Sequence, residues 1–198
     1  MEKSDIITER HPLQPFLPQN ARILMLGSFP PSHKRWSMEF FYPNYINDMW
    51  RIFGIVLYDD KLHFVDEAHK TFRIADIIAM LRSRGIAIYD TACAIRRTTG
   101  TASDKDLEIV ERTDIDALLR KIPQCHAIVT TGQKASEVVA EHFGIDIPKV
   151  GHHSSFAFEG RDMKFWRMPS SSRAYPMNIQ SKATHYRALF SAEGLIGK

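Results

Sequence analysis

Apolar runs alternate with segments of helical periodicity along most of this chain. Four short runs have the apolar character of strands buried in a parallel sheet, and they cover residues 23–27, 86–91, 126–132 and 164–171. Five segments carry apolar residues at helical spacing, and they cover residues 47–57, 71–85, 114–123, 133–144 and 180–194. Asn47 stands at the start of the first of these helices, where an asparagine is a favourable N-cap.

This alternation predicts an α/β fold. Strands that alternate with helices form a three-layer α/β/α sandwich, here with a central, largely parallel sheet of four to five strands. No repeat or low-complexity tract interrupts the pattern. With 198 residues, we expect one domain that spans residues 1–198.

The predicted sheet places four loops at one edge. In open parallel sheets, ligands bind beyond the carboxyl ends of the strands. The loops at those ends cover residues 27–32, 90–100, 130–134 and 169–175, and they are rich in small, polar and basic residues. A ligand site at this edge is the expectation.

Composition limits the classes of ligand. The formal net charge is only +3, so affinity for nucleic acid must come from local clusters such as Lys34, Arg35, Arg96 and Arg97. A solvated charged surface is the more common interpretation of any one of these residues. The two cysteines are too few for a four-thiolate cluster or a disulfide scaffold.

Metal and membrane signals are weak. His126, His152 and His153 lack a third ligand at suitable spacing, so we expect no metal and no other cofactor. The first residues have no apolar segment, and no run reaches about 18 apolar residues. We therefore expect a soluble, cytoplasmic protein, most simply a monomer, with no membrane partner.

Two loops contain side chains that suit a nucleotide ligand. Ser170, Ser171, Ser172 and Arg173 directly follow the last strand, where hydroxyls and a guanidinium can hold a phosphate diester. A serine-rich turn without any ligand is an equally good interpretation. The segment 40–42 is aromatic throughout, which favours stacking on a base, although such residues are more often core.

Four motifs in order resemble the uracil-DNA glycosylase superfamily. They are GSFPP (27–31), FYPNYINDMWRIFG (41–54), IAIYDTACAIRRTTGTASDKDL (86–107) and MPSSSRAY (168–175). RRTTGTASDKDL and MPSSSR resemble the mismatch-specific thymine/uracil-DNA glycosylase branch, whereas GSFPP and NDMWRIFG resemble the hypoxanthine-DNA glycosylase branch. The resemblance implies a monofunctional enzyme of base excision repair that flips a deaminated or mismatched base, most simply uracil or hypoxanthine, out of DNA and hydrolyses its N-glycosidic bond.

The resemblance also implies which residues catalyse the reaction. The first motif of the mismatch-specific branch carries an asparagine that positions water, but Phe29 stands there in this chain and cannot orient water. In the hypoxanthine branch the matching position is Asn47, and Asp48 beside it is a second candidate, as a general base.

The remaining roles follow from the same resemblance. Phe41 or Tyr42 would stack on the flipped base, and Asp90 would accept a hydrogen bond from its ring N–H. Gly27 and Ser28 would complete the base pocket. DNA contacts would come from Ser170, Ser171, Ser172, Arg173, Lys34, Arg96 and Arg97, with Arg173 filling the gap left in the duplex.

Two alternatives stay open at this point. The loss of the first-motif asparagine at Phe29 suits a non-catalytic protein that senses lesions without cleaving them. An unrelated α/β hydrolase or nucleotide-binding domain is also conceivable, but the chain contains neither a glycine-rich phosphate loop nor a GxSxG motif.

Overall fold

The computed structural model describes residues 7–97 and 107–197, and its centre is a five-stranded sheet. The strand order is β5-β2-β8-β10-β9. The bounds are β2 (Ile23–Gly27), β5 (Ile86–Asp90), β8 (Ala127–Thr131), β9 (His152–Phe158) and β10 (Arg161–Met168). β5, β2, β8 and β10 run parallel, and β9 pairs antiparallel with β10 at one edge. The predicted, largely parallel sheet is confirmed.

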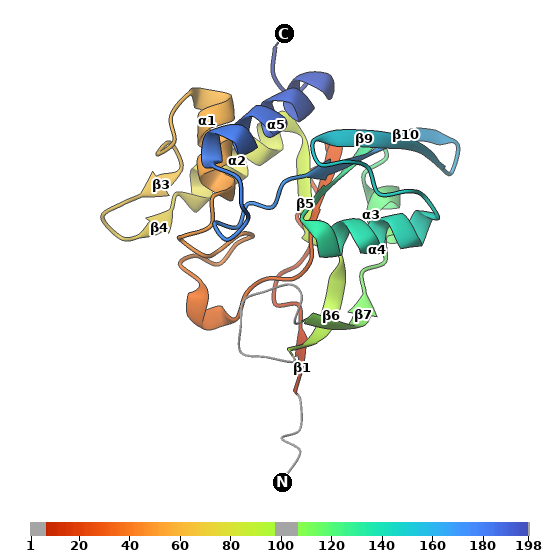
Figure 1. The fold of residues 1–198 in the computed structure, drawn as a ribbon, viewed down its shortest axis with the longest axis horizontal. Coiled ribbons are helices and arrows are strands. Elements are labelled where there is room, and N and C mark those ends of the chain that lie inside the picture. The colour runs from red at the N-terminus through yellow and green to blue at the C-terminus, as the bar shows by residue number, and fades with distance from the viewer. Residues whose placement is uncertain (1–6, 98–106, 198) are drawn as a thin grey trace.

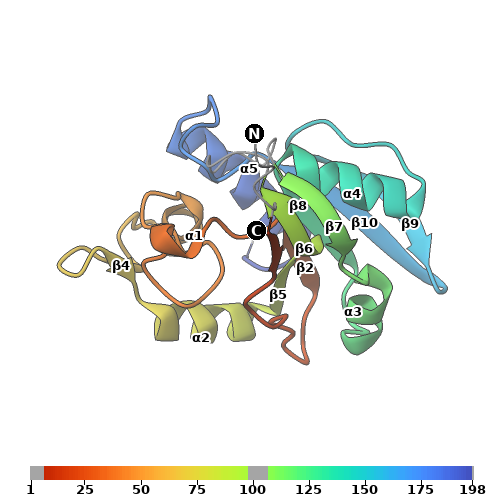
Figure 2. The ribbon, with the colours of Figure 1, turned by 90° about the horizontal axis from the view of Figure 1, so that it is seen from below.

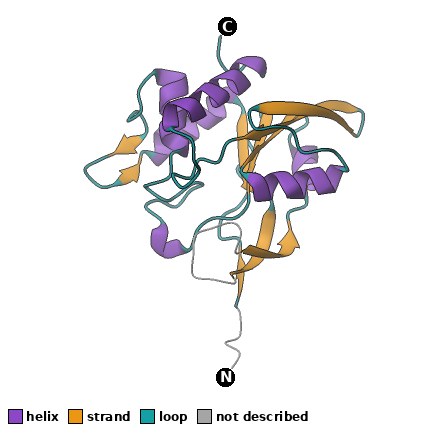
Figure 3. Cartoon of the chain, in the orientation of Figure 1, coloured by secondary structure: helices purple, strands orange, loops and turns teal. Residues whose placement is uncertain are grey.

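Helices cover both faces of this sheet, so the molecule has three layers (Figures 1 and 2). The helices are α1 (Met49–Tyr58), α2 (Ile74–Arg84), α3 (Ile115–Lys121), α4 (Gln133–Phe143) and α5 (Ile179–Ala192). α1, α2 and α5 lie on one side of the strands, and α3 and α4 lie on the other (Figure 3).

The core explains why the central strands are so apolar. Every residue of β2, β5 and β8 is buried, because helices cover both faces of the sheet. On one face, Phe53 of α1 packs edge-on against Phe190 of α5, with ring centroids 5.1 Å apart. This contact packs α1 against α5.

A second, smaller sheet was not predicted. It contains β1 (Thr8–Arg10), β6 (Ala92–Arg97) and β7 (Leu107–Arg112), in the order β1-β6-β7. The prediction of a loop over residues 90–100 is therefore wrong for 92–97, while 98–100 lie outside the described residues. The strand forms because Ala92 and Ile95 bury their side chains in a satellite cluster with Phe29 and Leu107.

Other boundaries also shift. The strand β9 escaped prediction because an edge strand alternates exposed and covered positions instead of being apolar throughout. Thr71 and Phe72 form β4 (Thr71–Phe72) with β3 (Val65–Asp66), so α2 starts later than expected. The N-cap position of α1 belongs to Asp48 and not to Asn47. A short 3₁₀ helix, η1 (His33–Arg35), follows β2.

Across the described parts of the chain, no helix combines the length and apolarity that crossing a membrane requires.

Candidate functional site

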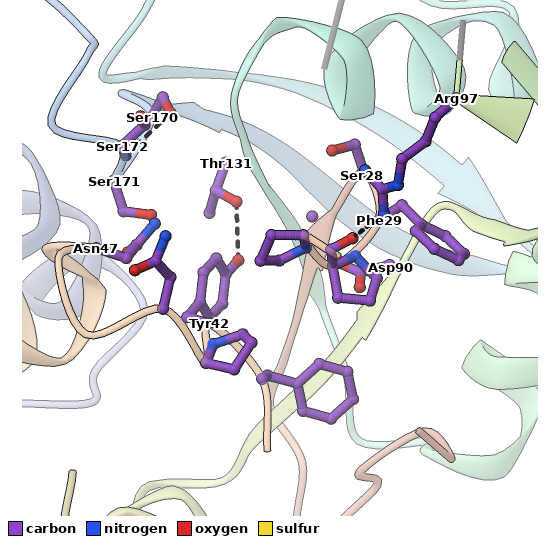
Figure 4. Close-up of a pocket in the computed structure, with 16 residues that line it drawn as sticks. Ser28, Phe29, Tyr42, Asn47, Asp90, Arg97, Thr131, Ser170, Ser171 and Ser172 are labelled. Atoms are coloured by element: carbon purple, nitrogen blue, oxygen red, sulfur yellow. Dashed lines mark hydrogen bonds between the residues drawn. The ribbon is translucent and has the colours of Figure 1, made fainter. Parts of the chain in front are cut away.

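A pocket of about 150 Å³ opens at the carboxyl ends of the parallel strands (Figure 4). Each of the four predicted loops contributes to it, together with the segment that leads into α1. The lining residues are Gly27, Ser28, Phe29, Pro30, Pro31, Phe41, Tyr42, Pro43, Asn44, Asn47, Asp90, Arg97, Thr131, Ser170, Ser171 and Ser172. In Figure 4, Ser28 and Asp90 lie on one side of the pocket, whereas Asn47 and Ser171 lie on the other.

Gly27 and Asp90 form one end of the pocket. They are register partners at the ends of the parallel strands β2 and β5. A β-carbon at position 27 would collide with Oδ1 of Asp90 and would lie 3.6 Å from the hydroxyl of Tyr42. Only glycine leaves space for the carboxylate to lie against the pocket wall.

The Asp90 carboxylate has a partner that sequence reasoning missed. Nε2 of His11 lies 2.8 Å from Oδ2 of Asp90, and the His11 side chain is only 2% exposed. Its ring packs against Tyr89 and Phe29, with centroids 4.6 Å and 5.2 Å away. Burial raises the pKa of Tyr89 well above its usual value. No local sequence signal marks His11, because its partner lies far along the chain.

Phe41 and Tyr42 form the wall between the two ends. Tyr42 has a left-handed backbone, with φ of 52°, and its hydroxyl lies 2.8 Å from Oγ1 of Thr131. The carbonyl of Phe41 accepts a hydrogen bond from the indole of Trp50 at 3.0 Å. A non-glycine residue with positive φ is uncommon and persists only where its surroundings hold it. The aromatic segment is therefore firmly placed.

Asn47 lies where α1 begins. Its Oδ1 accepts a hydrogen bond from the N–H of Met49 at 2.9 Å, so the side chain satisfies one donor of the first turn even though Asp48 occupies the cap position. Within the described ranges 7–97 and 107–197, one lone pair of the oxygen and the amide N–H groups stay available to other partners.

Asp48 does not line the pocket. Its two carboxylate oxygens lie 3.1 Å from Nε of Arg173 and 3.3 Å from Nζ of Lys182. Lys182 is completely buried, and it also donates a hydrogen bond to the carbonyl of Ser172 at 2.7 Å. The N–H of Asp48 donates to the carbonyl of Ser171. Asp48 and Lys182 thus hold the loop of residues 169–175, called the serine loop below, against the start of α1.

The serine loop shows both features that the sequence suggested. Oγ of Ser170 accepts a hydrogen bond from the N–H of Ser172, and Oγ of Ser172 accepts one from the N–H of Ala174, both at 3.2 Å. These bonds are those of serine-stabilised turns. The same loop nevertheless lines the pocket at 170–172.

Among the predicted basic DNA contacts, Arg97 alone lines the pocket in the described structure. Its guanidinium donates to the carboxylate of Glu9 and to the carbonyl of Pro30. Arg96 lies 3.8 Å from Glu108 instead, and Lys34 is exposed on η1.

Phe29 contributes to the pocket lining, but its ring packs into a separate hydrophobic cluster. The ring belongs to the cluster with Ala92, Ile95 and Leu107, and the Arg97 guanidinium lies 5.8 Å from its centroid. An apolar ring in this position contributes surface and no polar group.

The histidines considered for metal binding lie apart from the pocket. His126 pairs with Glu193, and His152 and His153 are exposed on β9. Within residues 7–97 and 107–197, no three histidine, cysteine, aspartate or glutamate side chains gather as a metal site would require.

Comparisons with known proteins were made for both sequence and structure. No family model matches the chain, and no curated protein sequence matches it. Among solved structures, the chain is similar to the solution NMR structure of "a putative Uracil DNA glycosylase from Methanosarcina acetivorans". The TM-score is 0.63 and the sequence identity 22%, over 95% of this chain and 99% of that chain. This chain therefore has the fold of that protein along nearly its whole length.

Proposed function

We propose that this protein is a monofunctional DNA glycosylase that excises a deaminated or mismatched base, uracil or hypoxanthine in the simplest case. One observation carries the proposal. A single small pocket contains aromatic rings, a buried carboxylate at one end, and an amide at a helix N-terminus at the other. The similar fold of the protein described as "a putative Uracil DNA glycosylase" supports the same activity.

Base recognition follows from hydrogen-bond chemistry. Deamination converts the ring nitrogen of cytosine (N3) or adenine (N1) from an acceptor into an N–H donor. An ionised Asp90 accepts hydrogen bonds and donates none, so a carboxylate facing that ring nitrogen favours the deaminated base. Phe41 or Tyr42 would supply the stacking surface, and Gly27 and Ser28 the adjoining wall.

The reaction needs a water molecule and a stabilised leaving group. The bond from C1′ to the base nitrogen breaks, and the base leaves as an anion with the electron pair. The oxygen of water bonds to the oxocarbenium-like C1′, and the proton that the water loses goes to the departing base. Asn47 would orient this water through the lone pair of Oδ1 that Met49 leaves unused. We prefer Asn47 to Asp48 because both oxygens of Asp48 bind cations outside the pocket.

DNA would lie across the rim formed by the serine loop and Arg97. Ser170, Ser171 and Ser172 are placed to meet a phosphate beside the flipped nucleotide. Lys34, Arg96 and Arg173 would contact the flanking backbone or, for Arg173, the vacated stack.

Single-turnover assays on labelled oligonucleotides test this function. The substrates contain uracil, hypoxanthine, xanthine or mismatched thymine, in single- and double-stranded DNA, with and without EDTA. We expect release of at least one deaminated base, unchanged by EDTA. Tight binding of such DNA without any release would instead establish the lesion-sensing alternative, and neither binding nor release would reject both.

A further inference from the structure

His11 and Asp90 form a buried pair at the base end of the pocket. The side chains are only 2% and 11% exposed, and Nε2 lies 2.8 Å from Oδ2. The pair is built from distant parts of the chain, because the N–H of His11 bonds to the carbonyl of Cys93 and continues the pairing of β1 with β6. The N-terminal segment therefore does not line the pocket but supports one of its lining residues, Asp90.

The contacts of His11 restrict where its protons lie. An ionised carboxylate only accepts hydrogen bonds, so Nε2 of His11 carries the proton shared with Oδ2 of Asp90. In the neutral ring, Nδ1 then accepts from the N–H of Leu13 at 3.1 Å. The protonated ring would donate from Nδ1 to the carbonyl of Leu13 at 3.0 Å and would keep the proton on Nε2. In both states Nε2 donates to Oδ2, which holds Asp90 as an acceptor.

The hydrogen bond from His11 to Oδ2 also fixes where the other carboxylate oxygen of Asp90 points. Oδ1 of Asp90 is the atom that lies over Gly27, the position from which it can meet a base. Packing against Phe29, Tyr89 and Phe41 prevents the imidazole from turning away. His11 acts on the base only through Asp90.

We propose that His11 is a positioning residue that holds the Asp90 carboxylate turned so that the pocket selects bases with a ring N–H. This inference rests on the proposed function and extends it to the source of selectivity. It makes a directional prediction for Asp90→Asn. Nε2 of His11 would bind the amide oxygen of the new side chain, so the amide NH₂ would face the pocket and donate to a bare ring nitrogen.

Base release from single-stranded DNA tests the selectivity. In Asp90→Asn, the ratio of cytosine to uracil release should rise by about 10-fold or more, because one buried donor or acceptor left unpaired has a cost of this order. In the double variant His11→Leu/Asp90→Asn the amide is no longer oriented, and this gain should disappear. An unchanged ratio in Asp90→Asn would overturn the proposal.

Single variants of His11 separate positioning from packing. His11→Leu should lower uracil release by about 10- to 100-fold, the range found when the outer-shell partner of a metal ligand is removed. His11→Gln keeps an N–H donor and should recover part of the loss at an equal melting temperature. The exposed His33→Ala is the matched control and should release uracil normally. Equal release by wild type and His11→Leu would also overturn the proposal.

NMR of the ¹⁵N-labelled histidine rings tests the pair without any turnover. The signals lost in His11→Leu should show Nε2 protonated, and free uracil should perturb them more strongly than free cytosine. A ring with a proton on Nδ1 and none on Nε2, or equal perturbation by the two bases, would reject the proposal. If the wild type releases no base, the proposed function fails, and this measurement still decides whether His11 orients Asp90.

Discussion

At the scale of single residues, Asn47 has two roles. Its Oδ1 accepts a hydrogen bond from the N–H of Met49, and its side chain lines the pocket. Asn47→Ser keeps an oxygen for the helix but lacks the amide. We expect single-turnover base release to fall by about 10²-fold, as when one preorganised polar group is lost, with a nearly unchanged melting temperature. Asn47→Ala should show the same loss of rate and a further loss of about 1 kcal/mol in stability. Asn47→Ser with the wild-type rate would remove Asn47 from catalysis.

The variant Gly27→Ala tests whether the base binds in the pocket beside Asp90. A methyl group at position 27 would collide with Oδ1 of Asp90. The Asp90 carboxylate would have to move to make room and would lose its hydrogen bond to the base, so Gly27→Ala should lower base release by about 10-fold or more. Gly197→Ala is the matched control, because none of the atoms in residues 7–97 and 107–197 lies within 4 Å of a β-carbon there. If both variants release base at the wild-type rate, the base does not bind against Gly27.

At the scale of elements, a buried ion pair fastens the serine loop and α1 to α5. Lys182→Met leaves the buried Asp48 with the half-exposed Arg173 alone, and we expect a loss of about 3 kcal/mol in the free energy of unfolding. Adding Asp48→Asn to the Lys182→Met variant should restore part of the lost free energy of unfolding. Urea unfolding measures both effects.

The exposed pair of Arg187 and Asp59 provides the control, since Arg187→Met should have a cost below about 1 kcal/mol. If Lys182→Met and Arg187→Met prove equally stable, the buried pair does not act as a clamp. A stable Asp48→Asn/Lys182→Met protein that releases base normally would also exclude Asp48 as the general base.

The serine loop should distinguish duplex from single-stranded DNA through Arg173. Its guanidinium is half exposed and pairs with Asp48, so it must leave that carboxylate to enter a gap in the duplex. We expect Arg173→Ala to slow release from duplex DNA several-fold more than from single strands, since only the duplex has a stack to fill. The ratio of the two single-turnover rates measures this. Equal slowing on both substrates would make Arg173 a general phosphate contact.

At the scale of the whole molecule, Glu193 ties the end of α5 to the sheet. Burial raises the pKa of this carboxyl, but the imidazole of His126, 3.0 Å from Oε2, and hydrogen bonds from Lys164 and Trp166 to Oε1 outweigh it and hold the pKa at about 2. Because the folded pKa lies below the unfolded one, the stabilisation is present above about pH 4.5 and is lost as the pH falls toward 2.

Glu193→Gln should therefore lower the melting temperature at pH 7 and flatten its decline between pH 4.5 and 2. Thermal unfolding followed across this range checks both statements. Glu137→Gln on the exposed side of α4 is a suitable control. Parallel profiles for wild type and Glu193→Gln would show that this network does not set acid stability.

Most of the central architecture could be predicted from the sequence. The strands β2, β5 and β8 are buried at every position and largely apolar because helices cover both faces of the sheet, and this leaves a signal in each strand alone. The position of the pocket followed from topology, since parallel strands bring their carboxyl ends to one edge. The antiparallel edge strand β9 was missed because it alternates exposed and covered positions, and β1 was missed because it pairs with the distant β6.

The sequence by itself determined the α/β order, the buried strands and the loops that meet at the pocket, because period and turn residues are local properties of the chain. Only the tertiary structure decided that His11 supports Asp90, that Lys182 and Arg173 hold Asp48 outside the pocket, and that Arg96 and Arg97 lie on a strand. These contacts join residues that are far apart along the chain, so their geometry exists only once the layers have packed.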